Sequence, residues 1–353
     1  MNNFLTAPYP SDYDFYFCPE TQRMELIRFL DTYWRKGHIL TRSMDLLNWQ
    51  HYNPAKQCYN FILAKHKRSH ELHGILGFIP SSQFDSQLTH QVVYSCIWKT
   101  RQDIQTPGLG KALYRYLYEH VAADLLATLG ISKIALDIYK HWHFITGTFE
   151  HFYLFNPQHP AVLSSQCLAH RGAKQLSNVS LQQLSQADFE QLSPQEPLFN
   201  NPYKSKTYYI NRFYKHPIYT YTFLGVRQDG QLKAILVTRV CQALNSRCCR
   251  IVDILGSLPP MASVLQHYLQ INAYEYMDLL CAGVSAQVLQ MAGFTNKKDN
   301  IQTVIPNYFE PFERKNVVLD FAYYPLAHIP TPQFFKADAD QDRPNLLPVN
   351  NEL

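Results

Sequence analysis

Gln105-Thr106-Pro107-Gly108-Leu109-Gly110 lies between an expected strand and an expected long helix. A glycine-rich turn at the start of a helix exposes backbone N–H groups, and these groups together with the helix dipole bind phosphate oxygens. Gly108 and Gly110 let the backbone approach an anion closely. Lys111 either adds positive charge to such a site or is a solvated helix lysine. The stretch therefore predicts a cradle for a phosphate-bearing ligand.

Two other phosphate-binding motifs do not fit this turn. A dinucleotide site of the form Gly-x-Gly-x-x-Gly needs a third glycine where Leu113 stands. A P-loop ends in Gly-Lys-Ser/Thr, which is also missing. Around the turn, apolar periodicity predicts helices, a hairpin and a third strand. The expected elements are a strand at 15–17, a helix at 20–34, strands at 59–64, 74–79 and 92–100, a helix at 111–129, a buried strand at 133–139 and a last strand at 148–155.

The second half of the chain repeats this order of elements. Asp229-Gly230 predicts a hairpin turn, and Pro259-Pro260 predicts the start of a helix. The chain therefore reads as two diverged copies of one unit, at 1–160 and 161–330, followed by a polar tail at 331–353 that we expect on the surface. The expected elements of the second half are a helix at 181–192, strands at 218–226, 232–240 and 250–255, a helix at 259–269, a strand at 274–281 and a helix at 285–292.

The spacing Gln105-x-x-Gly108-x-Gly110 between strand and helix resembles the pyrophosphate signature of the GNAT (Gcn5-related N-acetyltransferase) superfamily. The resemblance implies an α/β (α+β) fold of two tandem GNAT-like lobes, each a mixed, mostly antiparallel sheet flanked by helices. It implies coenzyme A, as acyl-CoA, for co-substrate, with pantetheine pairing along the strand edge. The implied coenzyme A site comprises Trp98, Lys99, Thr100, Gln105, Thr106, Gly108, Leu109, Gly110, Lys111 and Ala112.

The corresponding turn of the second half, residues 256–260, contains two prolines. Proline lacks the N–H that a phosphate cradle needs, so we do not expect the second lobe to bind coenzyme A. Gln290-Met291-Ala292-Gly293-Phe294 still resembles the end of the family's fourth helix. The second lobe either shapes the acceptor site or is a structural buttress.

Two stretches, 305–312 and 336–345, resemble tandem GNAT proteins that acylate nucleotide-linked amino sugars for bacterial surface polysaccharides such as O-antigen. The implied acceptor is an amino deoxysugar on a nucleotide, with dTDP expected. Tyr and Phe can stack on a base or sugar, and Arg343 could pair with a diphosphate. The alternating Asp residues also suggest calcium, but without the required Gly and Glu, or a solvated acidic tail. The expected acceptor-binding residues are Asn307, Tyr308, Glu310, Asp340, Asp342 and Arg343.

For catalysis, an amine would attack the thioester and form an oxyanion. The resemblance implies that a strand amide, that of Trp98, polarises the carbonyl. An amino-sugar nitrogen is less basic than a lysine amine, so a protein base can be dispensable. His151 is a candidate general base, and Tyr153 matches the family's acid loosely. Either residue can instead be structural.

The composition is that of a folded protein of two domains. At roughly 100–200 residues per domain, 353 residues predict two domains. Hydrophobic residues make up 46% and charged residues 17%, which excludes a disordered chain. The net charge is +4, and basic residues gather only at 65–68, where a turn is expected. We therefore expect no nucleic-acid partner.

No stretch indicates a leader or a membrane span, since no run approaches ~18 apolar residues. The 8 cysteines are scattered without a Cys-x-x-Cys pair, which favours reduced thiols in the cytoplasm. His141 and His143 have no matching ligands, so no metal is expected. The pattern does not determine the oligomeric state.

Other functions remain open at this stage. A transferase using aminoacyl-tRNA would need a basic face. A protein-lysine acyltransferase would modify peptides but not sugars. A non-catalytic binding module would have a spoiled glycine turn in both halves. The leading hypothesis is an N-acyltransferase acting on an amino sugar.

Overall fold

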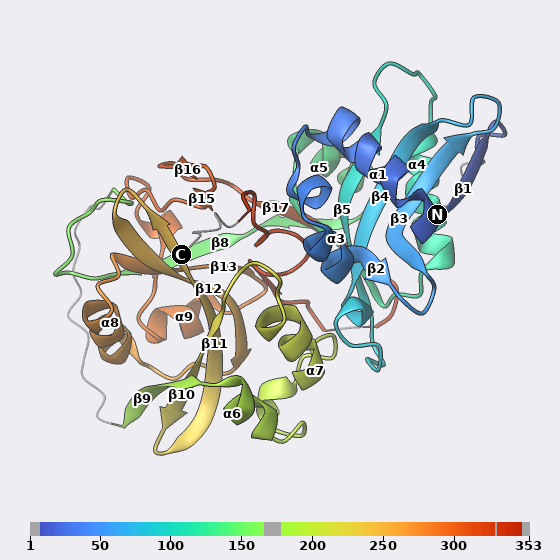
Figure 1. Cartoon of the computed structure of the whole chain (residues 1–353). Coiled ribbons are helices and arrows are strands. Elements are labelled where there is room, and N and C mark those ends of the chain that lie inside the picture. Colours follow the sequence, from blue (N-terminus) through green and yellow to red (C-terminus); the bar gives the residue numbers. More distant parts are fainter. Residues whose placement is uncertain (1–7, 166–177, 329, 348–353) are drawn as a thin grey trace, which may run out of the picture.

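The structure is a computed structural model that describes residues 8–165, 178–328 and 330–347. Two lobes lie beside each other, each built on one large twisted sheet with helices on its faces (Figure 1). This confirms the predicted class, a mixed α/β protein with two mostly antiparallel sheets. No helix in the described ranges is long and apolar enough to cross a membrane.

The first sheet has the strand order β1-β3-β4-β5-β6-β17-β7, with β2 paired to β3. Only β5 and β6 run parallel, and all other neighbours are antiparallel. Its strands are β1 (Tyr13–Pro19), β2 (Tyr52–Asn53), β3 (Cys58–His66), β4 (Leu72–Pro80), β5 (Val92–Thr100), β6 (Leu125–Ile131), β7 (Ile145–Thr148) and β17 (Asp320–Pro325).

The second sheet repeats this plan in the order β14-β8-β13-β12-β11-β10-β9, with β18 paired to β13. Its single parallel pair is β12 with β13, which corresponds to β5 with β6. Its strands are β8 (Glu150–Phe155), β9 (Val179–Leu184), β10 (Thr222–Gln228), β11 (Gln231–Ala243), β12 (Ser246–Gly256), β13 (Tyr276–Ala282), β14 (Thr295–Asn296) and β18 (Phe334–Phe335). A separate hairpin joins β15 (Tyr308–Phe309) to β16 (Phe312–Glu313).

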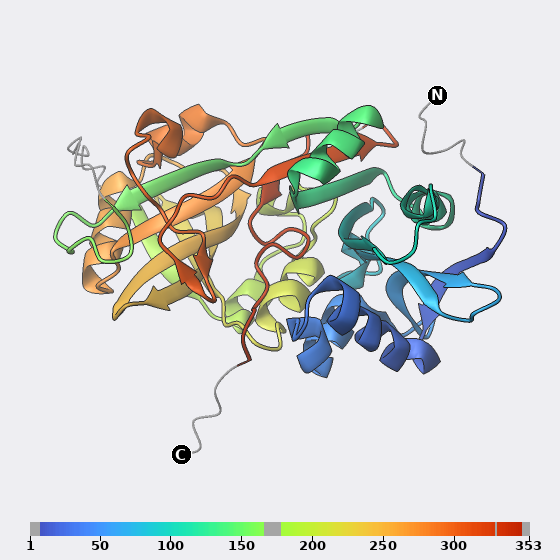
Figure 2. The ribbon, with the colours of Figure 1, turned by 90° about the horizontal axis from the view of Figure 1, so that it is seen from above.

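The two sheets exchange one strand each. β8 follows the strands of the first lobe in the chain but pairs with β13 in the second sheet, and β17 follows the second lobe but lies between β6 and β7 in the first. The two segments of the chain that lead into these strands cross where the Phe149 N–H donates to the Leu319 carbonyl, 2.9 Å away. Figure 2 shows the green β8 and the red β17 running between the lobes.

The expectation that 148–155 is the last strand of the first lobe is therefore wrong. The apolar residues of a strand indicate that it is buried in a sheet, but they do not indicate which of two similar sheets it joins. The division of the chain at residue 160 stays a prediction about chain order, since each sheet contains a strand from the other half.

Helices cover both faces of each sheet. In the first lobe α1 to α3 pack on one face and α4 with α5 on the other. In the second lobe α8 and α9 cover the outer face, whereas α6 and α7 share a core with residues of the first lobe. The helices are α1 (Arg23–Phe29), α2 (Ile39–Arg42), α3 (Met44–His51), α4 (Leu109–His120), α5 (Lys133–His141), α6 (Gln186–Gln191), α7 (Lys206–Tyr209), α8 (Ala262–Ile271) and α9 (Ala286–Met291).

Two expected elements after the glycine turn are wrong in type. The expected helix at 111–129 ends at His120, and its last part is β6; the expected strand at 133–139 is α5. The helical spacing of Leu113 and Leu117 continues by chance through Leu125, but burial beside β5 favours the extended form there. The Ser132 side chain accepts the Ala135 N–H as an N-cap, a signal that marks the start of α5.

A similar error affects the expected helix at 181–192. Residues up to Leu184 form β9, and only the remainder is helical, as α6. Ser185 and Asp188 form a capping box, with each side chain accepting from the other residue's backbone N–H. This Ser-x-x-Asp pattern shows in the sequence where the helix starts.

The lobes are joined through two corresponding segments of the halves. The Trp49 indole donates to the Asn211 carbonyl at 3.0 Å, and the Asn211 side chain donates to the Phe84 carbonyl at 2.7 Å. The Arg212 guanidinium lies 4.8 Å from the ring centroids of both Trp49 and Phe84. Arg212 also donates to the carbonyls of Ala337 and Ala339, which holds the C-terminal chain at the same interface.

Because each sheet needs a strand from the other half, we predict that the lobes unfold together. Leu279 is fully buried on β13 opposite Phe152 of β8, and Leu279→Ala should lower stability by about 2–5 kcal/mol. The 4 tryptophans all precede residue 150, so their fluorescence reports on the first lobe. In urea, fluorescence and circular dichroism should shift to the same lower midpoint. A tryptophan transition unchanged from wild type would contradict this, and Ile301→Ala at an exposed site is the control.

Candidate functional site

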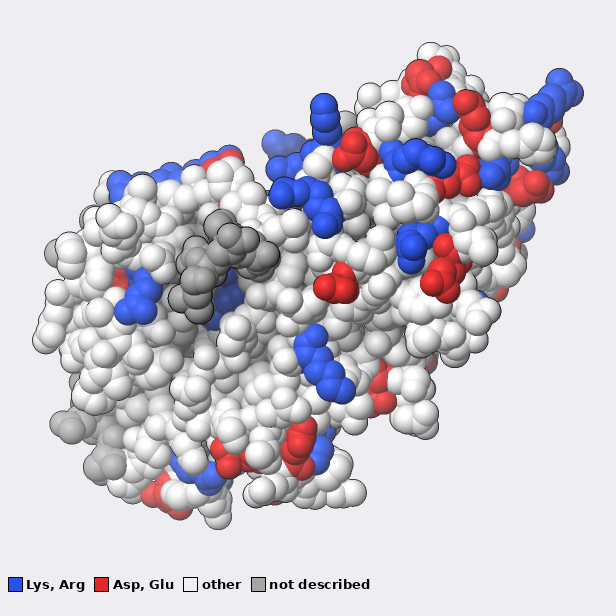
Figure 3. All heavy atoms as spheres, viewed as in Figure 1, with Lys and Arg blue, Asp and Glu red and all other residues white. Residues whose placement is uncertain are grey.

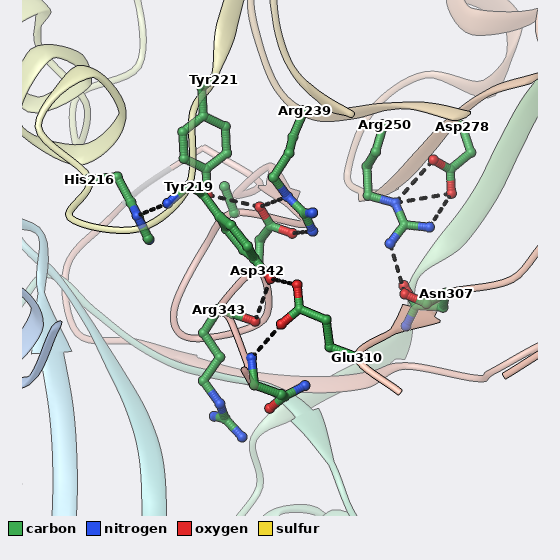
Figure 4. Close-up of polar contacts among 12 residues, drawn as sticks. His216, Tyr219, Tyr221, Arg239, Arg250, Asp278, Asn307, Glu310, Asp342 and Arg343 are labelled. Carbon is green, nitrogen blue, oxygen red and sulfur yellow. Dashed lines mark hydrogen bonds and ion pairs between the residues drawn. The ribbon is translucent and has the colours of Figure 1, made fainter. Parts of the chain in front are cut away.

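A cavity of about 370 Å³ lies between the lobes and is called here the interlobe cavity. The first lobe contributes the ends of β5 and β6 and the start of α5. The second lobe contributes β11, β12 and the chain at 307–310, and the C-terminal segment, residues 334–345, closes one side. Figure 4 shows that polar side chains from these separate elements meet at this place.

On the first lobe the cavity begins where β5 and β6 diverge. Their parallel pairing covers Val92–Ser95 and ends at Ser95 opposite Thr128, although β5 continues to Thr100 and β6 to Ile131. β6 is paired on its other side with β17. The end of β5 therefore offers one edge of backbone groups that β6 does not take up, and this edge faces the opening.

The glycine turn lies directly beside this opening. Gly108 has φ +81° and is the N-cap of α4, and a Cβ added there would meet no atom within 4 Å. A Cβ on Gly110 would lie 3.2 Å from the indole of Trp98, whose Nε1 donates to the Gly110 carbonyl at 3.1 Å. Trp98 also lines the interlobe cavity. The structure thus brings the turn, the end of β5 and the cavity together.

The other residues expected at this turn differ in exposure. Leu109 and Ala112 are buried and anchor α4 against the sheet. The Thr106 hydroxyl forms a 2.8 Å hydrogen bond with the Tyr13 hydroxyl, which fixes the turn. Gln105 is exposed, and the remaining expected residues are half-buried: Lys99, Thr100 and Lys111.

All the expected acceptor-binding residues line the interlobe cavity. Asn307, Tyr308 and Glu310 come from the chain around β15, and Asp340, Asp342 and Arg343 come from the C-terminal segment. The expectation that the tail lies on the surface, solvated and acidic, is wrong, because Phe334 to Asp340 is continuously buried. The apolar residues at 334, 335, 337 and 339 pack inside, and the carboxylates of Asp338 and Asp340 between and after them are paired with Lys204 and Arg343.

Two arginines, of which Arg250 is buried and Arg239 nearly so, bind carboxylates at the cavity wall (Figure 4). Arg239 is 2.6 Å from Asp342, which also accepts from the Tyr221 hydroxyl at 2.9 Å. Arg250 is 2.8 Å from Asp278 and donates to the Asn307 carbonyl at 2.8 Å. Burial raises the pKa of Asp342, but Arg239 lowers it more strongly, well below its usual range. Both pairs are therefore ionised at neutral pH.

The C-terminal segment is fixed to both lobes. The Tyr219 hydroxyl donates to Glu310 at 2.8 Å, and Glu310 also accepts the Asn345 N–H. Asp340 is paired with Arg343. The Gln341 side chain donates to the Leu129 carbonyl at 3.0 Å, one residue beyond the last β5–β6 pair. Asp340 and Arg343 are thereby held close to the diverging strands.

His151 and Tyr153 lie elsewhere. Both are on β8, buried in the second sheet, and neither is among the residues that line the interlobe cavity. His151 Nε2 is 3.0 Å from Asp278, and burial lowers its pKa despite that carboxylate, so the imidazole is neutral at pH 7. The exchange of β8 is the reason for this placement. Their catalytic role stays a prediction without support from the cavity.

Sequence reasoning found Arg343 but not the other basic residues of the cavity, Arg239, Arg250 and Lys336. Arg239 and Arg250 stand inside β11 and β12 next to apolar residues, and a charged side chain in such a position indicates an ion pair. Lys336 has no comparable signal, because it lies in an extended, irregular stretch. It is buried, and desolvation and then Arg250 lower its pKa to about 7.

Within the described ranges, no group of three or more His, Cys, Asp or Glu side chains is arranged to hold a metal ion. On the face seen in Figure 3, basic and acidic residues are interspersed rather than gathered by sign.

No protein-family model matches this sequence, and no sequence among the curated proteins does. Solved structures match it in fold. A GCN5-related N-acetyltransferase from Anabaena variabilis aligns with a TM-score of 0.50 and 9% identity, over 88% of this chain and 72% of that one. One from Sphaerobacter thermophilus has a TM-score of 0.46 and 10% identity, over 91% of this chain and 98% of that one. A Saccharomyces cerevisiae N-myristoyltransferase with bound myristoyl-CoA aligns with a TM-score of 0.47 and 9% identity, over 90% of this chain and 80% of that one.

At such low identity the first of these likenesses shows a shared fold. The expected tandem GNAT-like architecture is thereby confirmed over most of the chain.

The Arg250–Asp278–His151 cluster predicts the response to acid. Burial raises the pKa of Asp278, but Arg250 and then His151 lower it further, to about 2, below the unfolded value of about 3.9. Its stabilisation is therefore present above pH 4 and lost as pH falls toward 2. Asp278→Asn should cost about 3–5 kcal/mol at pH 7, because Arg250 is left unpaired, and should flatten this acid dependence. Urea unfolding between about pH 2 and 7 measures both, with the exposed Asp137→Asn as control. Equal pH profiles for wild type and Asp278→Asn would refute the prediction.

Proposed function

We propose that this protein is an N-acyltransferase that moves an acyl group from acyl-CoA to an amine. The observation that carries the proposal is the divergence of β5 and β6 beside a helix-initiating glycine turn, which opens into the interlobe cavity. One side of this opening suits a phosphate-bearing donor, and the other side is a polar cavity that suits an acceptor.

The residues at the turn fit coenzyme A. The first N–H groups of a helix have no partner within the helix, and at α4 they stand behind Gly108, where no side chain occupies the space. These groups would hold the pyrophosphate, and the free edge of β5 at Trp98 to Thr100 would pair with pantetheine. When bound, acyl-CoA supplies an activated thioester. The shared fold with a GCN5-related N-acetyltransferase supports this assignment.

The chain itself supplies position and electrostatics. A backbone N–H of β5 near Trp98 would stabilise the oxyanion that forms at the thioester carbonyl. Holding both substrates between two lobes that share strands fixes their geometry. Asp340 is linked to the diverging strands, because the Gln341 side chain donates both to its carboxylate and to the Leu129 carbonyl, and we assign it to the acceptor amine. His151 is not needed in this scheme.

For the acceptor we propose the amine of a nucleotide-linked amino deoxysugar, with dTDP as carrier, used for surface polysaccharide. Carboxylates at 310 and 340 suit sugar hydroxyls and an amine, and Tyr308 suits stacking. A cavity of about 370 Å³ holds a sugar with part of its carrier. The cysteines of the described ranges are all free, which agrees with a reducing, cytoplasmic setting where acyl-CoA is available.

Coenzyme A binding tests the first half of the proposal. Gly108→Asp puts a carboxylate at the N-terminus of α4, so we expect its affinity to fall about tenfold or more, measured by isothermal titration calorimetry. Gly230→Asp is a matched control, since Gly230 has φ +77° and equally open space, but in a hairpin turn of the second lobe. Failure of the wild type to bind coenzyme A at millimolar concentration would overturn the proposal.

Release of free coenzyme A thiol tests the acceptor. With acetyl-CoA as donor, a dTDP-linked amino deoxysugar should give thiol release well above background, and the same sugar nucleotide with a hydroxyl for the amine should not. Asp340→Asn should lower the rate by about ten- to a thousandfold, because it removes the carboxylate that is assigned to the acceptor amine. Turnover with lysine peptides but not with amino sugars would reject this acceptor class and leave the acyltransferase assignment in place.

A further inference from the structure

One cation in the interlobe cavity has no carboxylate partner. Lys336 lines the cavity and is only 4% exposed. It follows β18 in the C-terminal segment, so its backbone is fixed by pairing to β13. Within the described ranges, its ammonium group makes no hydrogen bond or ion pair. A buried ammonium without a partner is costly, so this position calls for an explanation.

The other cations of the cavity are neutralised by the protein. Arg239 is paired with Asp342, Arg250 with Asp278, and Arg343 with Asp340. The only further carboxylate in the lining, that of Glu310, accepts from Tyr219 and from backbone N–H groups. In the described lining, Lys336 is therefore the cation that no carboxylate contacts, and Glu310, the remaining carboxylate, is bonded to other groups.

A second, independent observation comes from the same cavity. Asn307 is 4% exposed and lines the same cavity, and both its side-chain nitrogen and its side-chain oxygen lack a hydrogen-bond partner. Its carbonyl is already taken by Arg250. Buried amide groups in folded proteins almost always have partners, so an unpaired one facing a cavity indicates a polar ligand.

We propose that Lys336 and Asn307 form a buried subsite for an anionic group, a carboxylate or a phosphate, carried by the acceptor. The ammonium would bind the anion directly, and the Asn307 amide would donate to it or bond an adjacent hydroxyl. The inference rests on the proposed function in one respect, that the ligand of this cavity is the acceptor.

The electrostatic surroundings of Lys336 favour an anion as its partner. The charged groups acting on it are Arg250 of β12, Arg239 of β11, Asp278 of β13 and Asp342 of its own segment. Burial, followed by the arginines, lowers the pKa of Lys336 to about 7, and the two aspartates oppose this. A bound anion would raise the pKa of the ammonium again. Binding above neutral pH should therefore draw a proton from solution.

The test compares two sources of the anion. Calorimetric titrations of the whole protein use dTDP, whose only anionic group is the diphosphate, and glucuronate, whose only anionic group is a carboxylate, with glucose as the neutral probe. Lys336→Met keeps the length of the side chain and removes its charge. We expect it to weaken at least one anion about tenfold or more and to leave glucose unchanged.

The outcome with each probe assigns the source. If Lys336→Met weakens only the binding of dTDP, the carrier phosphate occupies the subsite. If it weakens only the binding of glucuronate, the acceptor is an acidic sugar. Lys315→Met, at an exposed lysine outside the cavity lining, is the matched control and should bind like wild type. Equal affinities of wild type and Lys336→Met for both anions, or no binding of either anion by the wild type at millimolar concentration, would overturn the proposal.

A proton count gives a readout that a structural role would not change. At about pH 8, titrations in two buffers of different ionisation enthalpy should show proton uptake with the wild type and none with Lys336→Met. Asn307→Ala should weaken the same anion but keep the uptake. Uptake that persists in Lys336→Met would contradict the inference.

The failures of the two proposals can be told apart. Coenzyme A should bind Lys336→Met as it binds wild type, because the glycine turn is a separate site. A protein that binds anions through Lys336 but binds no coenzyme A would keep this subsite and lose the acyltransferase assignment. Circular dichroism confirms that each variant is folded.

Discussion

The backbone hydrogen bond from Phe149 to Leu319 marks the constraint on which the rest of the molecule depends. At this point the chain of the first half passes into the second sheet, and the chain of the second half passes into the first. Both side chains are buried, so the crossing lies inside the protein rather than in a linker. The two lobes are therefore parts of one cooperative structure, and the cavity between them has walls that are fixed relative to each other.

The crossing also explains how the C-terminal segment reaches the cavity. After β17 completes the first sheet, the chain has to return along the interface, where Arg212 and the pairing of β18 to β13 hold it. Its charged residues then enter a region of low solvent exposure, where each carboxylate meets a cation. Ion pairs of this kind contribute little net stability compared with apolar packing, but breaking one is costly, so they fix one arrangement of the segment.

The sequence allowed the overall class, the paired halves, the glycine turn and the cavity-lining residues near 307–310 and 340–343 to be predicted. Those predictions rest on local chemistry: turn residues at defined positions and polar groups in short stretches. The errors at β6 and α5 arose because Leu113, Leu117 and Leu125 satisfy a helical period, and only the neighbouring β5 decides that the last of them is in a strand. Two N-caps, at Ser132 and Ser185, were readable signals of where the helices start.

Other features were beyond any local pattern. The exchange of β8 and β17 depends on which of two similar sheets accepts each strand, and the residue pattern of a strand does not indicate that. Because of this exchange, His151 lies in the second sheet, away from the glycine turn, and the C-terminal segment, which the sequence predicted to be solvated, is buried. Lys336 could not be identified either, since its significance depends on which neighbouring charges are already neutralised.

The late position of β17 in the sequence has a consequence for folding during translation. The first lobe lacks an internal strand of its sheet until residue 325 has been synthesised and has left the exit tunnel, which is almost the whole chain. During that time the edges of β6 and β7 stay unpaired and are open to other strands. Whereas most multidomain chains fold their first domain during translation, this one has to postpone it, and nascent chains that stall or terminate early should need chaperones to escape aggregation.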